Sequence, residues 1–237
     1  MKELVHGVLH RLGVDVIRYD GRHFVGPRRM DAIRSTATTV VLDVGAGHGQ
    51  FVRRLRDEGY DGRIVSFEPV PEAFASLQRR AASDAALTCF RIALGDRDGE
   101  AVINRAGNVW SSSLLPMTQR HEAAAPDSAY VGEEPVRLAR LDSLDVLRPD
   151  DRAYLKIDVQ GAEGAVLDGA AGVLDRVVGI ELELSLVELY EGQDLLGVLH
   201  ERVRGEGFVL VWLGEAVFRD PASDEILALD AIFVRRG

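Results

Sequence analysis

Apolar runs and amphipathic stretches alternate along most of this chain. Short strands of buried type are predicted at residues 39–44, 63–68, 87–94, 154–158 and 177–184. Apolar residues at helical spacing predict helices at about 49–59, 71–82, 162–175 and 194–206. Two strands follow, at 208–213 and 231–235, the last of them antiparallel. The alternation predicts an α/β fold with a seven-stranded, mostly parallel sheet and helices on both faces.

The alternation breaks in the middle of the chain. Residues 100–105 alternate as an exposed strand does, residues 106–135 show no period, and residues 135–141 predict an edge strand. A connection of this length inside a compact domain is usually functional or mobile. We therefore predict a lid, inserted at about residues 100–140.

The N-terminal segment has a pattern of its own. Its apolar residues recur at helical spacing and predict a short amphipathic helix within residues 1–20: Leu4, Val5, Val8, Leu9 and Leu12. We expect this helix to pack on the edge of the domain rather than to contact a membrane. We divide the chain into an N-terminal helical cap, residues 1–38, and one domain, residues 39–237.

Composition narrows the class of protein. A chain of 237 residues that is 46% hydrophobic can bury one full core. The net charge of −10 argues against a nucleic-acid partner, which usually requires a basic face. No apolar stretch is long enough to span a membrane, no signal peptide is recognised, and the single Cys89 offers no disulfide. We expect a cytoplasmic protein, and the sequence leaves open whether it forms a homo-oligomer.

The first strand runs into a turn that is rich in glycine. Gly45, Gly47 and Gly49 occupy every second position, which lets the backbone pass close to a ligand. The next strand ends on Glu68, 19 residues after Gly49. A carboxylate there can accept both hydroxyls of an adenosyl ribose and disfavours the 2′-phosphate of NADP. The layout predicts a nucleoside-cofactor site at the carboxyl edge of the sheet.

The glycine spacing indicates which nucleoside binds. Dinucleotide enzymes use Gly-x-Gly-x-x-Gly, with the helix N-terminus facing a pyrophosphate. Here the third glycine comes one residue early, and the acidic Asp43 precedes the turn. An acid suits a cationic, amino-bearing ligand such as S-adenosylmethionine better than a diphosphate. Seven strands with a terminal pair also match the class I methyltransferase architecture, which is Rossmann-like, better than a six-stranded dinucleotide fold.

The fourth predicted strand ends at Asp158, at the same edge of the sheet. Asp158 should therefore lie close to Gly45 and Gly47, across the switch point between the first and fourth strands. Asp158 could act as the general base for a substrate hydroxyl or as a ligand for a divalent cation such as Mg²⁺. It could equally cap the next helix or anchor the cofactor amine. Glu181 and Glu183 share one face of the fifth strand, and Glu183 lies nearer the edge. Asp158 and Glu183 could therefore share a cation or a substrate polyol.

Two further observations concern the reaction. His121 lies in the predicted lid, where an imidazole could serve as a base near neutral pH, although a loop histidine is more often solvated. The Asn/Asp-Pro-Pro-Tyr/Phe turn that holds a planar amine for N-methylation is missing after the fourth strand. This favours an alcohol acceptor over a nucleobase.

Taken together, the motifs resemble the FkbM family of S-adenosylmethionine-dependent methyltransferases. They occur in order as LDVGAGHGQF (42–51), SFEP (66–69), ALGD (93–96), SSL (112–114), LDSL (141–144), LKIDVQGAE (155–163), ELS (183–185), LYEG (189–192) and DAIFVR (230–235). The resemblance implies O-methylation of a hydroxyl on a sugar or on a glycosylated or polyketide natural product. The implied partner is a small-molecule or carbohydrate acceptor.

The resemblance also implies roles for single residues. Asp43, Gly45 and Gly49 would hold the methionine part of the cofactor, Glu68 the ribose, and Asp158 would face the methyl group. The other implied cofactor contacts are Ala46, Gly47, Phe51, Pro69, Ala93, Leu94 and Ser113. The family usually has Asn where Gly47 stands, so a backbone contact would survive there and a side-chain hydrogen bond would be lost.

Two other classes of function remain beside the O-methyltransferase. A catalytically silent, cofactor-binding scaffold of a biosynthetic assembly would bind the cofactor tightly, turn over no polyol and capture a partner protein. A nicotinamide-dependent oxidoreductase is disfavoured by the glycine spacing.

Overall fold

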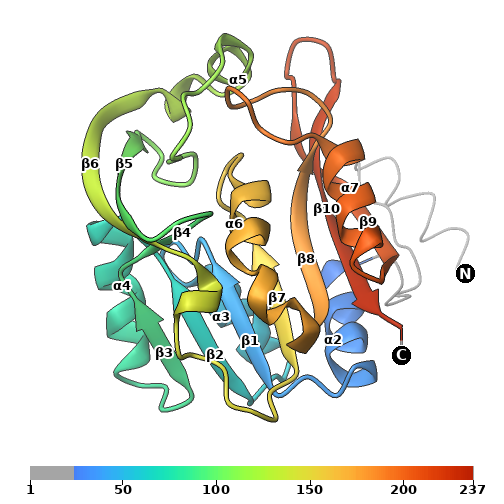
Figure 1. The fold of residues 1–237 in the computed structure, drawn as a ribbon. Coiled ribbons are helices and arrows are strands. Elements are labelled where there is room, and N and C mark those ends of the chain that lie inside the picture. The colour runs from blue at the N-terminus through green and yellow to red at the C-terminus, as the bar shows by residue number, and fades with distance from the viewer. Residues whose placement is uncertain (1–23, 237) are drawn as a thin grey trace, which may run out of the picture.

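A computed structural model of the protein describes residues 24–236, and a seven-stranded sheet forms its centre (Figure 1). The sheet order is β3-β2-β1-β7-β8-β10-β9. The parallel strands are β3 (Leu87–Phe90), β2 (Arg63–Phe67), β1 (Val40–Val44), β7 (Ala153–Ile157) and β8 (Val177–Ser185). β10 (Ile226–Arg235) runs antiparallel to both β8 and β9 (Phe208–Arg219). The predicted sheet is thus confirmed.

Continuous apolar sequence explains the central strands. β1 reads Val-Val-Leu-Asp-Val and all five residues are buried, as expected for a parallel strand that is covered on both faces. Residues that favour helix termini mark the ends of the helices. α4 (Pro71–Ala81) has Pro71 at its first position, Glu72 in the first turn and Arg80 in the last, an arrangement that suits the helix dipole.

Helices cover both faces of the sheet (Figure 1). α2 (Val25–Ser35), α3 (Gln50–Asp57) and part of α4 pack on one face around Val41, Ile64 and Ile232. α6 (Glu163–Gly169), the 3₁₀ helix η3 (Ala171–Arg176) and α7 (Leu196–Gly205) pack on the other. α2 falls within the predicted cap segment, but the amphipathic helix predicted at 1–20 lies outside the described residues. No helix within residues 24–236 has the length and apolar character of a membrane span.

The segment after β3 forms a second sheet rather than a continuation of the first. The strand predicted at 87–94 is wrong as a single element, because β3 ends at Phe90 and β4 (Ala93–Leu94) joins a three-stranded sheet of order β4-β6-β5. β5 (Gly99–Ala106) pairs antiparallel with β6 (Tyr130–Ala139). The edge position predicted for 135–141 is also wrong, since β6 lies between β4 and β5.

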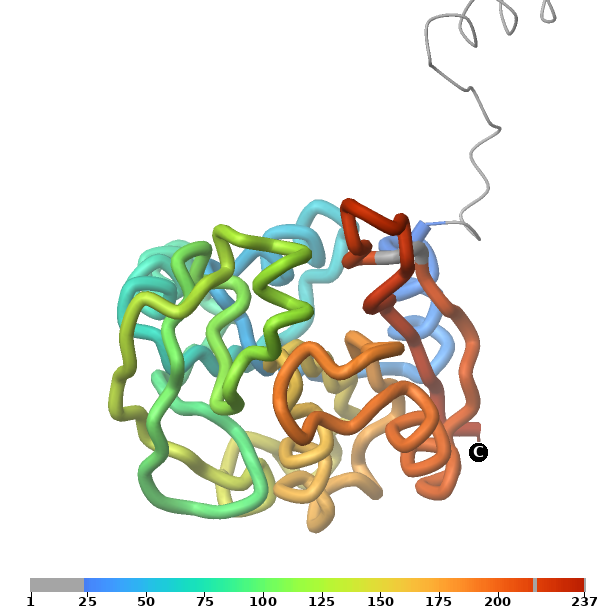
Figure 2. The backbone as a smooth tube through the Cα atoms, turned by 90° about the horizontal axis from the view of Figure 1, so that it is seen from above, coloured from blue at the N-terminus to red at the C-terminus, as the bar shows by residue number. Residues whose placement is uncertain are grey.

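The residues that connect β5 to β6 include short regular elements. α5 (Gln119–Ala124) begins after Thr118, whose hydroxyl accepts the backbone N–H of His121, and the 3₁₀ helix η1 (Pro126–Ser128) follows. Single turns of this kind leave no apolar period in the sequence, which is why the segment reads as irregular. Figure 2 shows the small sheet and this connection on one side of the molecule, facing the β8–β10 side.

Candidate functional site

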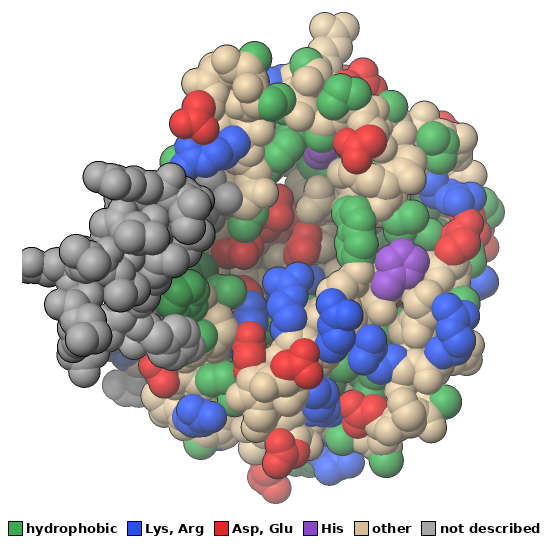
Figure 3. Space-filling view, turned by 180° about the vertical axis from the view of Figure 1, so that it is seen from behind, with side chains coloured by type: hydrophobic (Ala, Val, Ile, Leu, Met, Phe, Trp, Pro, Cys, Tyr) green, Lys and Arg blue, Asp and Glu red, His purple; other side chains and the backbone are tan. Residues whose placement is uncertain are grey.

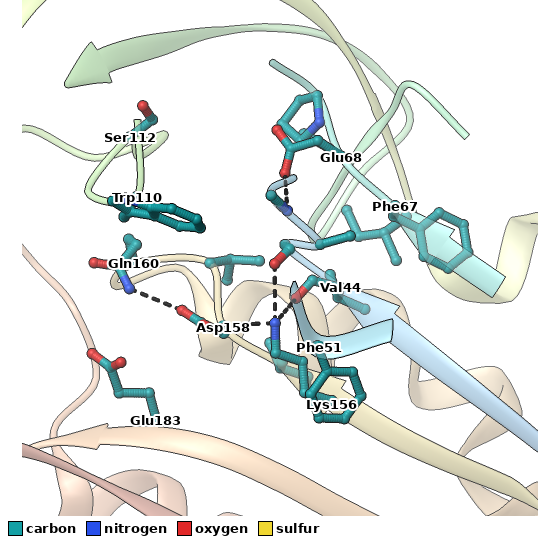
Figure 4. A pocket seen from close by; sticks show the side chains of 18 of the residues that line it. Val44, Phe51, Phe67, Glu68, Trp110, Ser112, Lys156, Asp158, Gln160 and Glu183 are labelled. Atoms are coloured by element: carbon teal, nitrogen blue, oxygen red, sulfur yellow. Dashed lines mark hydrogen bonds and ion pairs between the residues drawn. The ribbon is translucent and has the colours of Figure 1, made fainter. Parts of the chain in front are cut away.

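A cavity of about 290 Å³ opens at the carboxyl ends of β1, β2, β7 and β8. The small sheet adds residues of β4 and β5 to its wall. Figure 3 shows a hollow on the back face with acidic side chains inside it, and Figure 4 shows the cavity from close by. The predicted site residues that line the cavity are Gly45, Ala46, Gly47, Phe51, Glu68, Pro69, Ala93, Leu94, Ser113, Asp158 and Glu183. Asp43, Gly49 and His121 are not part of this lining.

The glycine turn joins the two central strands. Gly45 has φ +75°, and its N–H donates to the carbonyl of Phe67 at the end of β2. On the other side, the N–H of Asp158 donates to the carbonyl of Val44 at 3.1 Å. A Cβ on residue 45 would overlap the carbonyl oxygen of Asp158. Glycine is therefore required here both by the backbone angle and by the close approach of the β7 loop.

Replacing Gly45 with alanine is expected to destabilise the fold more than the backbone angle alone explains. Gly59 provides the matched control, because its φ is +87° and nothing lies within 4 Å of a Cβ built there. Gly59→Ala should cost about 1–2 kcal/mol of unfolding free energy, from the left-handed conformation. Gly45→Ala should cost roughly 2 kcal/mol more, from the overlap. Urea unfolding of both variants measures the difference, and equal losses would contradict this account.

Glu68 lies at the end of β2 with its carboxylate at the cavity wall. One oxygen accepts the N–H of Gly47 at 2.7 Å and the other accepts the N–H of Val70 at 2.8 Å (Figure 4). Burial raises the pKa of the carboxyl to about 7, against these two hydrogen bonds, which lower it. A carboxylate oxygen has several lone pairs, so Glu68 keeps acceptor capacity for a ligand hydroxyl.

Asp43 is buried beneath the glycine turn rather than facing a ligand. Its carboxylate accepts from the hydroxyl of Ser66 and lies 3.2 Å from the ammonium of Lys156. In the structure the cation beside Asp43 is therefore the ammonium of Lys156, and a contact between Asp43 and a cationic ligand stays a prediction. Gly49 likewise lies away from the cavity: it caps α3 and packs against Leu77 and Arg80.

Lys156 is a fixed cation at the base of the site. Besides Asp43, its ammonium contacts the carbonyl of Gly45 at 3.0 Å and Oδ2 of Asp158 at 3.5 Å. Burial opposes the charge, but Asp158 and Asp43 raise the pKa of Lys156 above its ordinary value. The residue stays protonated and ties the turn after β1 to the end of β7. Lys156 lies within the motif LKIDVQGAE, and nothing in its local sequence indicates this role.

The acidic residues of the cavity come from three strands. The side chain of Asp158 is 41% exposed and its Oδ1 accepts from the amide of Gln160 at 2.9 Å. Glu183 on β8 pairs in register with Asp230 on β10, and both line the cavity. Burial, helped by neighbouring carboxylates, raises the pKa of Glu183 well above its usual range and that of Asp230 to about 7. Such a surface favours a cationic or hydroxyl-bearing ligand.

The magnesium hypothesis for Asp158 and Glu183 finds no support. Within residues 24–236, no group of three or more His, Cys, Asp or Glu side chains is arranged to hold a metal ion. The cation beside Asp158 is the ammonium of Lys156. Glu181, which shares a strand face with Glu183, is instead bound to the buried Arg29 through two hydrogen bonds of 2.7 and 2.8 Å.

His121 is not brought together with Asp158. It is buried on α5, with its ring 5.0 Å from that of Tyr190 and 5.1 Å from that of Phe218. Burial lowers the pKa of its imidazole to about 4, so the ring is neutral at physiological pH. His121 therefore packs against aromatic rings and does not line the cavity where a base would meet a substrate.

Trp110 is a cavity residue that sequence analysis missed. Its indole lies against the glycine turn, 3.3 Å from where a Cβ on Gly47 would be, and is 54% exposed. A tight turn presents it: the N–H of Trp110 donates to the carbonyl of Asn108 at 2.8 Å around Val109, whose φ is +64°. The sequence around this loop shows no strand or helix period that would place Trp110 at the cavity. The signal that could have drawn attention to it is a tryptophan directly before three serines.

The sheet order and the position of the cavity at its switch point define the class I methyltransferase fold. A sequence profile of the family described as Methyltransferase FkbM domain matches residues 43–219. The chain belongs to this family, as the resemblance implied, and is a methyltransferase. It is 29% identical over 175 residues to 2-O-methyltransferase NoeI of Sinorhizobium fredii, covering 70% of this chain and 71% of that protein.

A solved structure has the same fold. The methyltransferase FkbM from Methylobacillus flagellatus KT superposes with a TM-score of 0.51 at 14% identity. The match covers 83% of this chain but only 43% of that longer protein. At this level of identity the likeness concerns the fold alone.

Proposed function

We propose that this protein transfers a methyl group from S-adenosylmethionine to a hydroxyl group of a carbohydrate, free or attached to a natural product. One observation carries the proposal: Glu68, the glycine turn and Asp158 all line one cavity. Glu68 is a carboxylate suited to a ribose, and Asp158 is a partly exposed carboxylate suited to a substrate hydroxyl.

The cavity fits an adenosyl cofactor. Apolar side chains suited to an adenine ring line it beside Glu68, namely Val70, Ile92, Ala93 and Leu94. Gly45 leaves no room for a Cβ, as expected of a turn that must approach its neighbours closely. A pyrophosphate would need backbone N–H groups of this turn, and the N–H of Gly47 is already bound to Glu68. The acidic floor favours a sulfonium and an amino group over phosphates.

When bound, S-adenosylmethionine supplies an electrophilic methyl group. The residues of the chain would then orient the acceptor oxygen and receive its proton, which is mainly a matter of positioning. Asp158 is suited to take the proton, because its carboxylate is exposed to the cavity and held on both oxygens. Lys156 would hold that carboxylate in place.

The acceptor assignment rests on the chemistry of the cavity. Carboxylates of Glu183 and Asp230 can accept hydrogen bonds from the hydroxyls of a sugar, and the face of Trp110 can pack on the C–H groups of a pyranose ring. The name of the 29% identical relative points to O-2 as the position to examine first.

A methyl-transfer assay tests this proposal. The protein is incubated with S-adenosylmethionine and a panel of methyl glycosides, chitooligosaccharides and polyketide aglycones, and the products are examined by mass spectrometry and NMR. A gain of one methyl group on a sugar oxygen supports the proposal, and the shifted carbon identifies the position. Transfer to an aglycone only, or to no acceptor, would contradict the carbohydrate assignment.

Cofactor affinity is expected to depend on pH through Glu68. The ionised carboxylate is the better acceptor for ribose hydroxyls, so affinity is highest above a pKa of about 7 and falls as the pH drops through it. Calorimetry with S-adenosylhomocysteine should show binding about tenfold weaker at pH 6 than at pH 8. Glu68→Gln, which cannot titrate, should bind more weakly but lack this component; identical pH dependence in both proteins would contradict the assignment.

A further inference from the structure

Gln160, two residues after Asp158, holds an unfavourable backbone conformation. Its φ is +58°, in the left-handed region that costs a residue with a side chain about 1–2 kcal/mol. The hydroxyl of Ser113 donates to its carbonyl at 2.6 Å, and Gly161 follows with φ +100°. Strain that the surroundings impose in this way is often found at functional sites. Ser113, predicted to contact the cofactor, thus also holds this turn.

The strained turn aims the side chain of Gln160 at Asp158 (Figure 4). Nε2 of Gln160 donates to Oδ1 of Asp158 at 2.9 Å, and Oε1 accepts from the hydroxyl of Tyr190 at 2.8 Å. These contacts fix the amide in one orientation, because a flipped amide would place its oxygen against the carboxylate. One oxygen of Asp158 thus faces Gln160 and the other faces Lys156.

Tyr190 is itself held rigidly. It is 2% exposed, and its backbone N–H donates to Oε1 of Gln193 at 2.7 Å. The ring of His121 packs against its ring at 5.0 Å, edge to face. The hydroxyl has one proton to donate, and Oε1 of Gln160 at 2.8 Å is a nearer acceptor than the carbonyl of Ser111 at 3.2 Å. Ser113 thus holds the backbone of Gln160, and Tyr190 holds its side-chain amide.

We propose that Tyr190 and Gln160 form a positioning relay that holds Asp158 in the orientation in which it receives the proton of the acceptor hydroxyl. The inference rests on the proposed function. A half-exposed carboxylate on its own would rotate among several rotamers, and a displacement of about 1 Å at a reacting group can cost roughly 100-fold in rate. Neither residue needs to touch the reacting atoms.

The test compares two tyrosine hydroxyls. Tyr190→Phe removes the hydrogen bond to Gln160 and keeps the ring. Tyr60→Phe is the matched control, because the hydroxyl of Tyr60 donates to the carbonyl of Arg63 at 3.3 Å and Tyr60 does not line the cavity. We expect Tyr190→Phe to lower kcat about 10- to 100-fold, with the Kd for S-adenosylhomocysteine within about twofold of wild type. Tyr60→Phe should keep both values near wild type.

A second variant separates positioning from folding. Gln160→Gly removes the amide and relieves the backbone strain, so kcat should fall while the unfolding free energy stays the same or rises. The variant also identifies the side-chain ¹⁵N amide signal of Gln160 by its loss. That signal should move in Tyr190→Phe and stay in place in Tyr60→Phe, a readout that needs no turnover.

The outcomes separate the relay from the proposed function. An active wild type whose kcat and Gln160 amide signal are unchanged by Tyr190→Phe would overturn the relay and leave the function standing. Parallel losses of kcat and cofactor affinity would also overturn it, as they would indicate a structural role. A wild type that methylates no acceptor would overturn the function, and an amide signal unmoved by Tyr190→Phe would then overturn the relay as well.

Discussion

Asp158→Asn is expected to reduce kcat by about 10²- to 10⁴-fold, the range typical for loss of a general base. Asparagine keeps the size of the side chain, and its oxygen can still accept from the amide of Gln160 at the position where Oδ1 accepts it now. It cannot take up the proton of an acceptor hydroxyl. The Kd for S-adenosylhomocysteine should therefore change only a few-fold. Single-turnover kinetics and calorimetry on the same preparation measure the two effects separately.

Two neighbouring acids provide the controls for Asp158. Glu183→Gln and Asp230→Asn remove carboxylates that line the same cavity and that the account assigns to acceptor hydroxyls. They should raise KM for the acceptor more than they lower kcat. If Glu183→Gln instead abolishes turnover and Asp158→Asn does not, the base is Glu183. An equal loss of cofactor binding in Asp158→Asn would make Asp158 a cofactor-binding residue.

Glu68→Ala is expected to weaken binding of S-adenosylhomocysteine by at least about 100-fold. Two hydrogen bonds from ribose hydroxyls to a carboxylate are together worth roughly 3 kcal/mol, which corresponds to that factor. The substitution also frees the N–H groups of Gly47 and Val70, which Glu68 now accepts at 2.7 and 2.8 Å. The cofactor side of the cavity therefore loses both its acceptor and part of its shape. Calorimetric titration measures the loss.

Glu72→Ala is the matched control for Glu68. Glu72 belongs to the helix that follows, its side chain is 54% exposed, and its carboxylate pairs with Arg105 outside the cavity. Removing it should leave cofactor affinity within about twofold of wild type, since an exposed ion pair contributes little. Urea unfolding of both variants checks that each is folded. Glu68→Ala with wild-type affinity would exclude Glu68 as the ribose acceptor.

The parts that were predictable from sequence are those that local patterns determine. β1 and β2 are short apolar runs that end in a glycine turn and in Glu68, and parallel strands bring their carboxyl ends to one edge. The same rule placed Asp158 and Glu183 at the cavity. Strand–helix alternation likewise gave the seven-stranded sheet and its antiparallel end.

The parts that were not predictable depend on contacts between distant segments. The lysine that neutralises Asp43 lies on β7, so Asp43 read alone resembles a ligand contact. The sequence made His121 a candidate base in the predicted lid, because nothing nearby in sequence indicates that its ring packs against Tyr190 and Phe218. Asp230 lies on the last strand, and only the antiparallel pairing of β10 with β8 brings it opposite Glu183.

The small sheet illustrates the same limit. β5 and β6 are separated by more than twenty residues and pair antiparallel, from Gly99 with Leu138 to Ala106 with Tyr130. Half-exposed strands carry a weak alternating signal, and register is set by the partner rather than by the strand itself. The sequence therefore indicated strands at 100–105 and 135–141 but not their pairing, and it predicted a lid where the structure has a wall of the cavity.

The most direct test of the central claim is calorimetric titration of the wild-type protein with S-adenosylhomocysteine and, separately, with NAD. We expect micromolar binding of S-adenosylhomocysteine at one site per chain and no binding of NAD, because the cavity pairs a ribose acceptor with an acidic floor. Binding of NAD, or of neither nucleoside at millimolar concentration, would contradict the assignment of this cavity as a methyl-donor site.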